Sequence, residues 1–290
     1  MWHNQSKTTL SLYKNLFKQT VIYGLATVLP RMISFLLNPL YTKVLPKQEF
    51  ADVSIIFAWL VFFNVILSYG METAFFRFYN TEENKKNVIA TSTISLFWTS
   101  LAFLFIALLN RKSLSHWANV DVEYITYTIW ILVLDALAII PFSKLRANKK
   151  PMVYAAIKIG NVTLNIALNL FFLLLLPQLA KSNPSGFFNT IFYENFEVGY
   201  IFVSSLIASL LTFVVVSPDY FKIKWHFDFS LWKKMIQYGF PILIAGIAFA
   251  INEHFDKILL EWLKVPKADI GAYSACYKIG MFMVLFRTAY

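Results

Sequence analysis

The sequence has 290 residues, of which 58% are hydrophobic and only 14% are charged. Soluble domains have roughly 45–50% apolar and about 25% charged residues, so this composition argues against a soluble enzyme or binding module. The net charge of +10 would suit a nucleic-acid partner in a soluble protein. Here the basic residues gather between apolar runs, so we expect a role in membrane topology and no nucleic-acid partner.

Eight apolar segments are long enough, or nearly long enough, to cross a bilayer as helices, which requires about 20 residues. In chain order they are Thr20–Tyr41, Phe50–Phe76, Val88–Leu109, Tyr124–Phe142, Met152–Leu176, Val198–Val216, Ile236–Leu260 and Ile270–Tyr290. With the amino terminus in the cytoplasm, fourteen Lys and Arg residues fall in the inside segments and seven in the outside segments. The sequence therefore predicts an all-α polytopic membrane protein with about eight transmembrane helices and a cytoplasmic amino terminus.

The first predicted helix carries a polar stripe on one face. Its members are Thr27, Arg31, Ser34, Asn38 and Thr42, spaced 4, 3, 4 and 4. Ionisable residues are expensive at membrane depth, so a functional role is the default hypothesis. We predict that this face lines a cavity, with Arg31 as the key cation and Asn38 beside it. The alternative is packing against neighbouring helices through small polar contacts.

Two acidic residues fall inside the second and fourth predicted helices. Glu72 follows Asn64 and Ser68 at a spacing of four, and Asp135 lies in the fourth helix. Each carboxylate is a candidate for binding a coupling cation or proton. Such acids more often neutralise a nearby Arg or Lys, and we favour this structural pairing.

The fifth predicted helix has a second polar stripe, with spacings of 3, 4 and 4. Its members are Lys158, Asn161, Asn165 and Asn169. We take the first three as candidate cavity residues. Two other interpretations stay open: hydrogen bonds between helices, and a Lys158 side chain that extends to the inner interface.

The last two predicted helices carry the remaining charges at membrane depth. The seventh contains Glu253, His254, Asp256 and Lys257. Glu253 and Lys257 are four residues apart and could pair on one helical face, and Asp256 is a third candidate for ion coupling or charge pairing. The eighth contains Lys278 and Arg287, which we add to the predicted substrate site.

A nine-residue pattern occurs at residues 46–54, after the first predicted helix, and again at 266–274, after the seventh. Pro, Lys and Ser match between the copies, although so short a match also arises by chance. A period of six helices gives both copies the same orientation, as in parallel transporter repeats. We therefore predict a six-helix first lobe at 1–225 and the start of a pseudo-symmetric second lobe at 226–290, so that the chain is a fragment.

The sequence gives no sign of catalysis, a metal or a cofactor. The four histidines lack metal-binding spacing, and no glycine-rich phosphate loop is present. The single cysteine cannot form an internal disulfide. We expect no catalytic residues, no metal and no cofactor.

Several short motifs resemble the polysaccharide transporter branch of the multidrug/oligosaccharidyl-lipid/polysaccharide exporter superfamily. They are Arg31, residues 38–42, the turn at 49–51, residues 69–77, the loop at 146–149 and residues 269–273. The resemblance implies two pseudo-symmetric lobes of six helices that move substrate through a central cleft by alternating access. In the similar lipid II flippases, arginines of the first helix bind the lipid pyrophosphate. Arg31 matches the first of these, whereas the second falls near the apolar Leu37.

The resemblance and the cationic stripes together predict a flippase in the bacterial inner membrane. It would move undecaprenyl-diphosphate-linked oligosaccharide to the outer leaflet for cell-surface polysaccharides such as lipopolysaccharide. Arg and Lys side chains suit the diphosphate. The expected partners are this lipid-linked oligosaccharide and membrane lipids, with polysaccharide polymerase machinery as a further candidate. Two alternatives stay open: a cation-coupled multidrug exporter of the same superfamily, and a membrane oligosaccharide polymerase or ligase.

Overall fold

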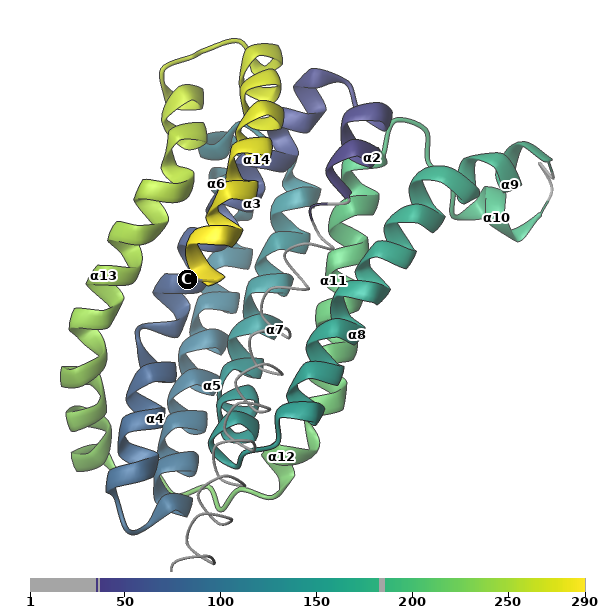
Figure 1. The fold of residues 1–290 in the computed structure, drawn as a ribbon. Coiled ribbons are helices and arrows are strands. Elements are labelled where there is room, and N and C mark those ends of the chain that lie inside the picture. Colours follow the sequence, from purple (N-terminus) through teal and green to yellow (C-terminus); the bar gives the residue numbers. More distant parts are fainter. Residues whose placement is uncertain (1–34, 36, 183–185, 290) are drawn as a thin grey trace, which may run out of the picture.

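The computed structural model describes residues 35, 37–182 and 186–289, with side chains described up to residue 280. Within this part the chain is helical and has no strand. The elements are α2 (Leu37–Val44), α3 (Lys47–Ser68), α4 (Met71–Thr81), α5 (Lys85–Leu109), α6 (Arg111–Ala118), α7 (Val122–Ala147), α8 (Pro151–Leu170), η1 (Phe171–Leu175), α9 (Leu176–Ser182), α10 (Phe187–Thr190), α11 (Glu197–Val216), α12 (Pro218–Phe221), α13 (Phe229–Trp262) and α14 (Lys267–Ala289). The long helices run side by side as a bundle (Figure 1).

Six helical spans in the described part are long and apolar enough to cross a membrane. They are Lys47–Thr81, Lys85–Leu109, Val122–Ala147, Pro151–Ser182, Glu197–Phe221 and Phe229–Trp262. These correspond to the second to seventh predicted segments. Most of the first predicted segment lies outside the described residues, and α14 occupies the place of the eighth. The predicted all-α polytopic membrane fold is confirmed.

Local signals explain where several helices begin. The side chain of Asn84 accepts the backbone N–H of Asn87 at 3.2 Å and caps α5. Asp228 accepts the N–H of Leu231 at 2.9 Å and caps α13. Pro151 opens α8, where its missing N–H costs no hydrogen bond. The seventh predicted helix therefore begins seven residues earlier than its apolar run, because the cap at Asp228 precedes a polar first turn.

The second predicted helix is broken into α3 and α4, whereas its apolar run predicts one continuous segment. Tyr69 (φ 33°) and Gly70 (φ 72°) adopt left-handed backbone conformations between α3 and α4. A Cβ atom on Gly70 would collide with the backbone carbonyl of Gly239 in α13. The break thus accommodates a close approach of two backbones, for which glycine is suited on both sides.

The buried core lies between the central helices. α7 packs on α11, α5 and α3, and α13 packs along α3 and α4. Large side chains that are almost fully buried include Phe50, Ile56, Leu132, Ile201 and Phe202. Large apolar side chains on the outside of α5 and α11, such as Phe105 and Val215, are exposed. These outer faces suit lipid acyl chains.

The two copies of the nine-residue pattern lie against each other, because α14 packs along α3. Phe50 and Ile270, at equivalent positions of the pattern, are both buried. The backbone of Gly271 approaches the carbonyl of Lys47 so closely that a Cβ atom would collide with it. The lobe boundaries at 225 and 226 stay a prediction.

Candidate functional site

The predicted cationic residues fall into two groups. Arg31 lies outside the described residues, as does the side chain of Arg287. Lys158 and Lys278 are described, and both are half-buried. The amine of Lys158 lies 4.5 Å from the ring centre of Phe142, and that of Lys278 lies 5.0 Å from the ring centre of Phe50. Within the described part, neither lysine has a carboxylate at ion-pair distance.

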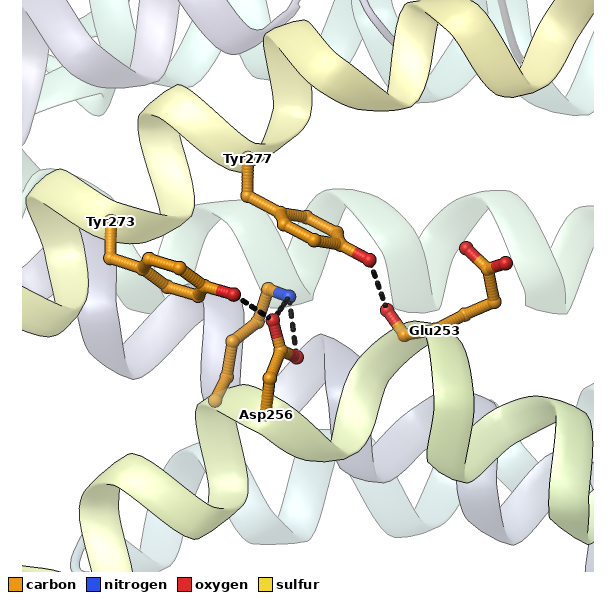
Figure 2. Close-up of polar contacts among 5 residues, drawn as sticks. Glu253, Asp256, Tyr273 and Tyr277 are labelled. Carbon is orange, nitrogen blue, oxygen red and sulfur yellow. Dashed lines mark hydrogen bonds and ion pairs between the residues drawn. The ribbon is translucent and has the colours of Figure 1, made fainter.

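A group of charged and phenolic side chains connects α13 to α14. We call it the α13–α14 cluster, and its members are Glu253, Asp256, Lys257, Tyr273 and Tyr277 (Figure 2). The Lys257 amine donates to both carboxylate oxygens of Asp256, at 2.8 and 3.0 Å. The Tyr273 hydroxyl donates to the same carboxylate at 2.6 Å. The Tyr277 hydroxyl donates to the backbone carbonyl of Glu253 at 3.2 Å. The cluster therefore ties the two helices together.

Lys257 does not form the ion pair that its helical spacing allows with Glu253. Lys257 pairs with the adjacent Asp256 instead. Tyr273 holds the Asp256 carboxylate from α14, while the Lys257 amine lies 3.8 Å from the ring centre of Tyr277. Contacts from the second helix thus select the partner, and helical spacing within α13 alone does not.

Glu72 forms the structural charge pair that we favoured for it. Its carboxylate accepts a hydrogen bond from the Arg146 guanidinium at 2.6 Å, across α4 and α7. The guanidinium also lies 4.7 Å from the ring centre of Phe76. This interaction leaves Glu72 a poor candidate for binding a coupling ion.

Asp135 differs from Glu72, because it has no ion pair among the described residues. It accepts a hydrogen bond from the Ser209 hydroxyl at 2.9 Å. It lines a cavity of about 260 Å³ between α3, α7, α8 and α11, together with Asn64, Asn161 and Asn165. We call this the Asp135 cavity. A direct ion pair is therefore found at Glu72, whereas Asp135 has the charge of Lys158 nearby without a direct contact in the described part.

The asparagines of α8 form hydrogen bonds to α11. Asn161 donates to the Thr212 hydroxyl at 2.8 Å, and Asn165 donates to the Ser205 hydroxyl at 3.0 Å. We call these four residues the α8–α11 amide ladder. Asn161 and Asn165 also border the Asp135 cavity. The interpretation as hydrogen bonding between helices thus applies to both, while their contact with substrate stays a prediction.

Asn38 lies in α2 and is buried. Its amide oxygen has no hydrogen-bond partner, although a buried polar atom is costly to leave unpaired. This unpaired oxygen is compatible with the predicted role of Asn38 beside a polar ligand.

Sequence reasoning missed the two tyrosines that complete the α13–α14 cluster. Tyr273 and Tyr277 are four residues apart on α14, so they share a helical face. That spacing was a usable signal. In contrast, no local signal links Glu72 to Arg146, because their contact depends on how α4 and α7 pack. Within the described part, no group of His, Cys, Asp or Glu side chains is arranged to hold a metal ion.

Comparisons with known proteins give one family and one fold. The family described as "Polysaccharide biosynthesis protein" matches residues 16–289. No curated protein matches the chain. A solved structure titled "Inward-facing conformation of a multidrug resistance MATE family transporter of the MOP superfamily" is similar, with a TM-score of 0.64 and 14% identity over 87% of this chain. At this identity the similarity shows the fold alone, and the matched part is 58% of that structure's chain.

Proposed function

The chain belongs to the polysaccharide biosynthesis protein family, and from this premise we propose that it flips an undecaprenyl-diphosphate-linked oligosaccharide. Family and fold point to a membrane transporter rather than an enzyme. The proposed direction is from the cytoplasmic to the outer leaflet of a bacterial inner membrane, by alternating access. A cytoplasmic amino terminus and a link to the polysaccharide polymerase machinery belong to the same proposal.

The observation that carries the proposal is Lys278. Its amine lies in α14, in the place of the eighth predicted membrane segment, against the ring of Phe50, and no described carboxylate is at ion-pair distance from it. The neighbouring Lys257, by contrast, is paired with Asp256. An unpaired cation at this depth is expensive unless it serves an anionic ligand. A diphosphate supplies that charge, and we propose that Arg31, Lys158 and Arg287 contribute to holding it.

The sugars of the head group need hydroxyl and amide partners. Asn38 offers a buried amide oxygen without a partner. Asn161 and Asn165 border a cavity, although their amides already donate to α11. We therefore propose Asn38 as the stronger sugar contact of the three.

Coupling to an ion gradient is proposed at Asp135. Glu72 and Asp256 both have a cationic partner. Asp135 has only neutral hydrogen-bond partners among the described residues and lines a cavity. A carboxylate in this situation is suited to take up a proton or a small cation.

The second candidate function is a cation-coupled multidrug exporter of the same superfamily. The Asp135 carboxylate favours it, because a cationic drug needs an anionic partner. The unpaired Lys278 opposes it. Drug-resistance profiling of a deletion strain, alongside analysis of its surface polysaccharide, separates the two functions.

Complementation of a bacterium that lacks its own flippase tests the proposal. We expect the wild-type protein to restore surface polysaccharide, and Arg31→Ala and Lys278→Gln to export far less at equal expression. Lys233→Gln, at an exposed position of α13, is the matched control and should export normally. Wild-type export by both Arg31→Ala and Lys278→Gln would remove the cationic site from the account.

A further inference from the structure

A cavity of about 370 Å³ opens where the turn between α13 and α14 meets the end of α6. This is the end of the bundle opposite the α4–α5 turn (Figure 1). We call it the seam pocket, and the lining residues that matter here are Trp117, Asn119, Glu261, Trp262, Lys264 and Lys267. Its volume lies in the range of roughly 300–1,000 Å³ that is usual for small-molecule sites. It is separate from the α13–α14 cluster and from the Asp135 cavity.

Two indole rings form one wall of the seam pocket. The ring centres of Trp117 and Trp262 are 5.5 Å apart, and both rings pack on Trp59, at 4.7 and 6.1 Å. Trp59 is only 8% exposed, whereas Trp117 is 49% and Trp262 is 44% exposed. The rings are thus supported from behind and open in front. Such fixed aromatic faces pack well on the flat C–H face of a sugar ring.

Polar groups form the other edge. Asn119 donates to one carboxylate oxygen of Glu261 at 2.7 Å, while the other oxygen is buried without a hydrogen-bond partner. Lys267 donates to the backbone carbonyl of Asn119 at 2.7 Å and to Asp52 at 2.6 Å. An unpaired buried carboxylate oxygen is costly. A hydroxyl group of a ligand would satisfy it.

Opposite charges meet in and around the seam pocket. Its charged lining residues are Glu261, Lys264 and Lys267, and Lys267 is already paired with Asp52, near which Asp121 also lies. A phosphate group would meet the Glu261 carboxylate, and a cationic ligand would meet the two lysines. The pocket therefore suits a neutral ligand with an apolar ring face and hydroxyl groups at its edge.

We propose that the seam pocket binds a neutral pyranose ring of the transported oligosaccharide. This inference rests on the proposed function, because it gives the sugars a binding place apart from the diphosphate. Trp117 lies in α6 and Asn119 caps its end, whereas Glu261, Trp262 and Lys264 belong to α13 and the turn after it. The pocket is complete only while these two parts are in contact, so sugar binding favours the conformation described here.

Fluorine NMR of the 290-residue chain in detergent micelles tests the site directly. The eight tryptophans are replaced by 5-fluorotryptophan, which gives each indole its own signal. The probes are glucose, galactose, N-acetylglucosamine and N-acetylgalactosamine, with mannitol and inorganic phosphate for comparison. We expect the Trp117 and Trp262 signals to shift saturably with at least one pyranose. The Trp98 signal, from an exposed ring on α5, should stay in place.

Variants separate binding from folding. Glu261→Gln keeps the carbonyl that accepts from Asn119 and should bind the pyranose about tenfold more weakly. Trp262→Ala should abolish saturable binding, whereas Trp262→Phe should retain part of it. Trp98→Ala is the matched control and should bind normally. The proposal is overturned if no pyranose shifts the two signals, or if mannitol or phosphate shifts them equally, which would leave interfacial anchoring as the role of these tryptophans.

The complementation assay distinguishes this inference from the proposed function. Saturable pyranose binding without restored export supports the seam pocket and contradicts the flippase. Restored export without any pyranose binding overturns the seam pocket and leaves the flippase proposal standing.

Discussion

The α8–α11 amide ladder and the α13–α14 cluster are both polar groups that connect long helices, yet their chemistry differs. In the amide ladder, Asn161 and Asn165 donate to hydroxyl groups of α11, and no charge is involved. In the cluster, Lys257 and Asp256 form an ion pair that two tyrosines of α14 surround. Beside that pair, Lys278 has no described carboxylate partner.

Neutral and charged polar stripes on membrane helices therefore have different consequences. Neutral amides and hydroxyls satisfy one another across a helix interface, at roughly 0.6–2 kcal/mol per contact. Charges need an opposite charge or a ligand, because leaving one unpaired at depth is far more costly. The ladder therefore holds helices together, whereas we propose the uncompensated charge of Lys278, near the cluster, as a contact for an anionic substrate.

The largest effect on stability should come from Lys257→Ala. It leaves the Asp256 carboxylate without its cation, although Tyr273 still donates to it. We expect a loss of about 3 kcal/mol, measured by thermal unfolding in detergent micelles. The double variant Lys257→Ala/Asp256→Asn should recover most of this loss. A double variant as unstable as the single one would show that the ion pair is not what stabilises the cluster.

Lys278→Gln should separate transport from stability. Removing a cation that has no described carboxylate partner should leave the melting temperature unchanged or slightly higher. Export should fall roughly tenfold, the scale of one lost charge-assisted contact to phosphate. Melting curves and export measured on the same variant check this. A parallel loss of both would assign Lys278 a structural role.

Asn161→Ala should lower stability and leave transport near normal. It removes the hydrogen bond to Thr212 and should cost about 1 kcal/mol while export stays near normal. Thr163→Ala, at an exposed position of the same helix, is the control and should change neither quantity. Lost export at unchanged stability would instead return Asn161 to the substrate site, where the sequence had placed it.

The smallest effect on stability is expected at Asp228, which lies outside both the amide ladder and the α13–α14 cluster. The backbone N–H of Leu231 and the Asn87 amide donate to it and hold the pKa of its carboxyl below the usual value. A lowered folded-state pKa means that the charge stabilises the fold above the unfolded-state pKa, about 3.9. That contribution is lost as pH falls through the folded-state value. Asp228→Asn should therefore lower the melting temperature slightly at pH 7 and match the wild type in acid.

Apolar length predicted most of the helices, because lipid requires about 20 apolar residues whatever the neighbours are. The break at Gly70 was not predictable in this way. It follows from the approach of Gly239, which lies in a helix far along the chain. The start of α13 was missed for a local reason, since its first turn is polar and only the Asp228 cap marks it.

The sequence predicted which residues of the candidate site are polar more reliably than it predicted which residues they contact. Periodicity showed that Asn161 and Asn165 share a face, but the identity of the facing helix depends on packing. Helical spacing suggested Glu253 as the partner of Lys257. Lys257 instead pairs with Asp256, whose carboxylate also accepts a hydrogen bond from Tyr273 of α14. Partners in a membrane bundle are set by helix order around the bundle, which no single segment encodes.

Flipping in proteoliposomes tests the central claim most directly, by comparing one oligosaccharide on a diphosphate carrier and on a neutral polyprenol carrier. The rate at which each becomes accessible on the opposite side of the membrane is measured for the wild-type protein and for Lys278→Gln. We predict that the wild type moves the diphosphate-linked form much faster and that this advantage shrinks about tenfold in Lys278→Gln. Equal rates for both carriers in the wild type would contradict an anion-binding site between these helices.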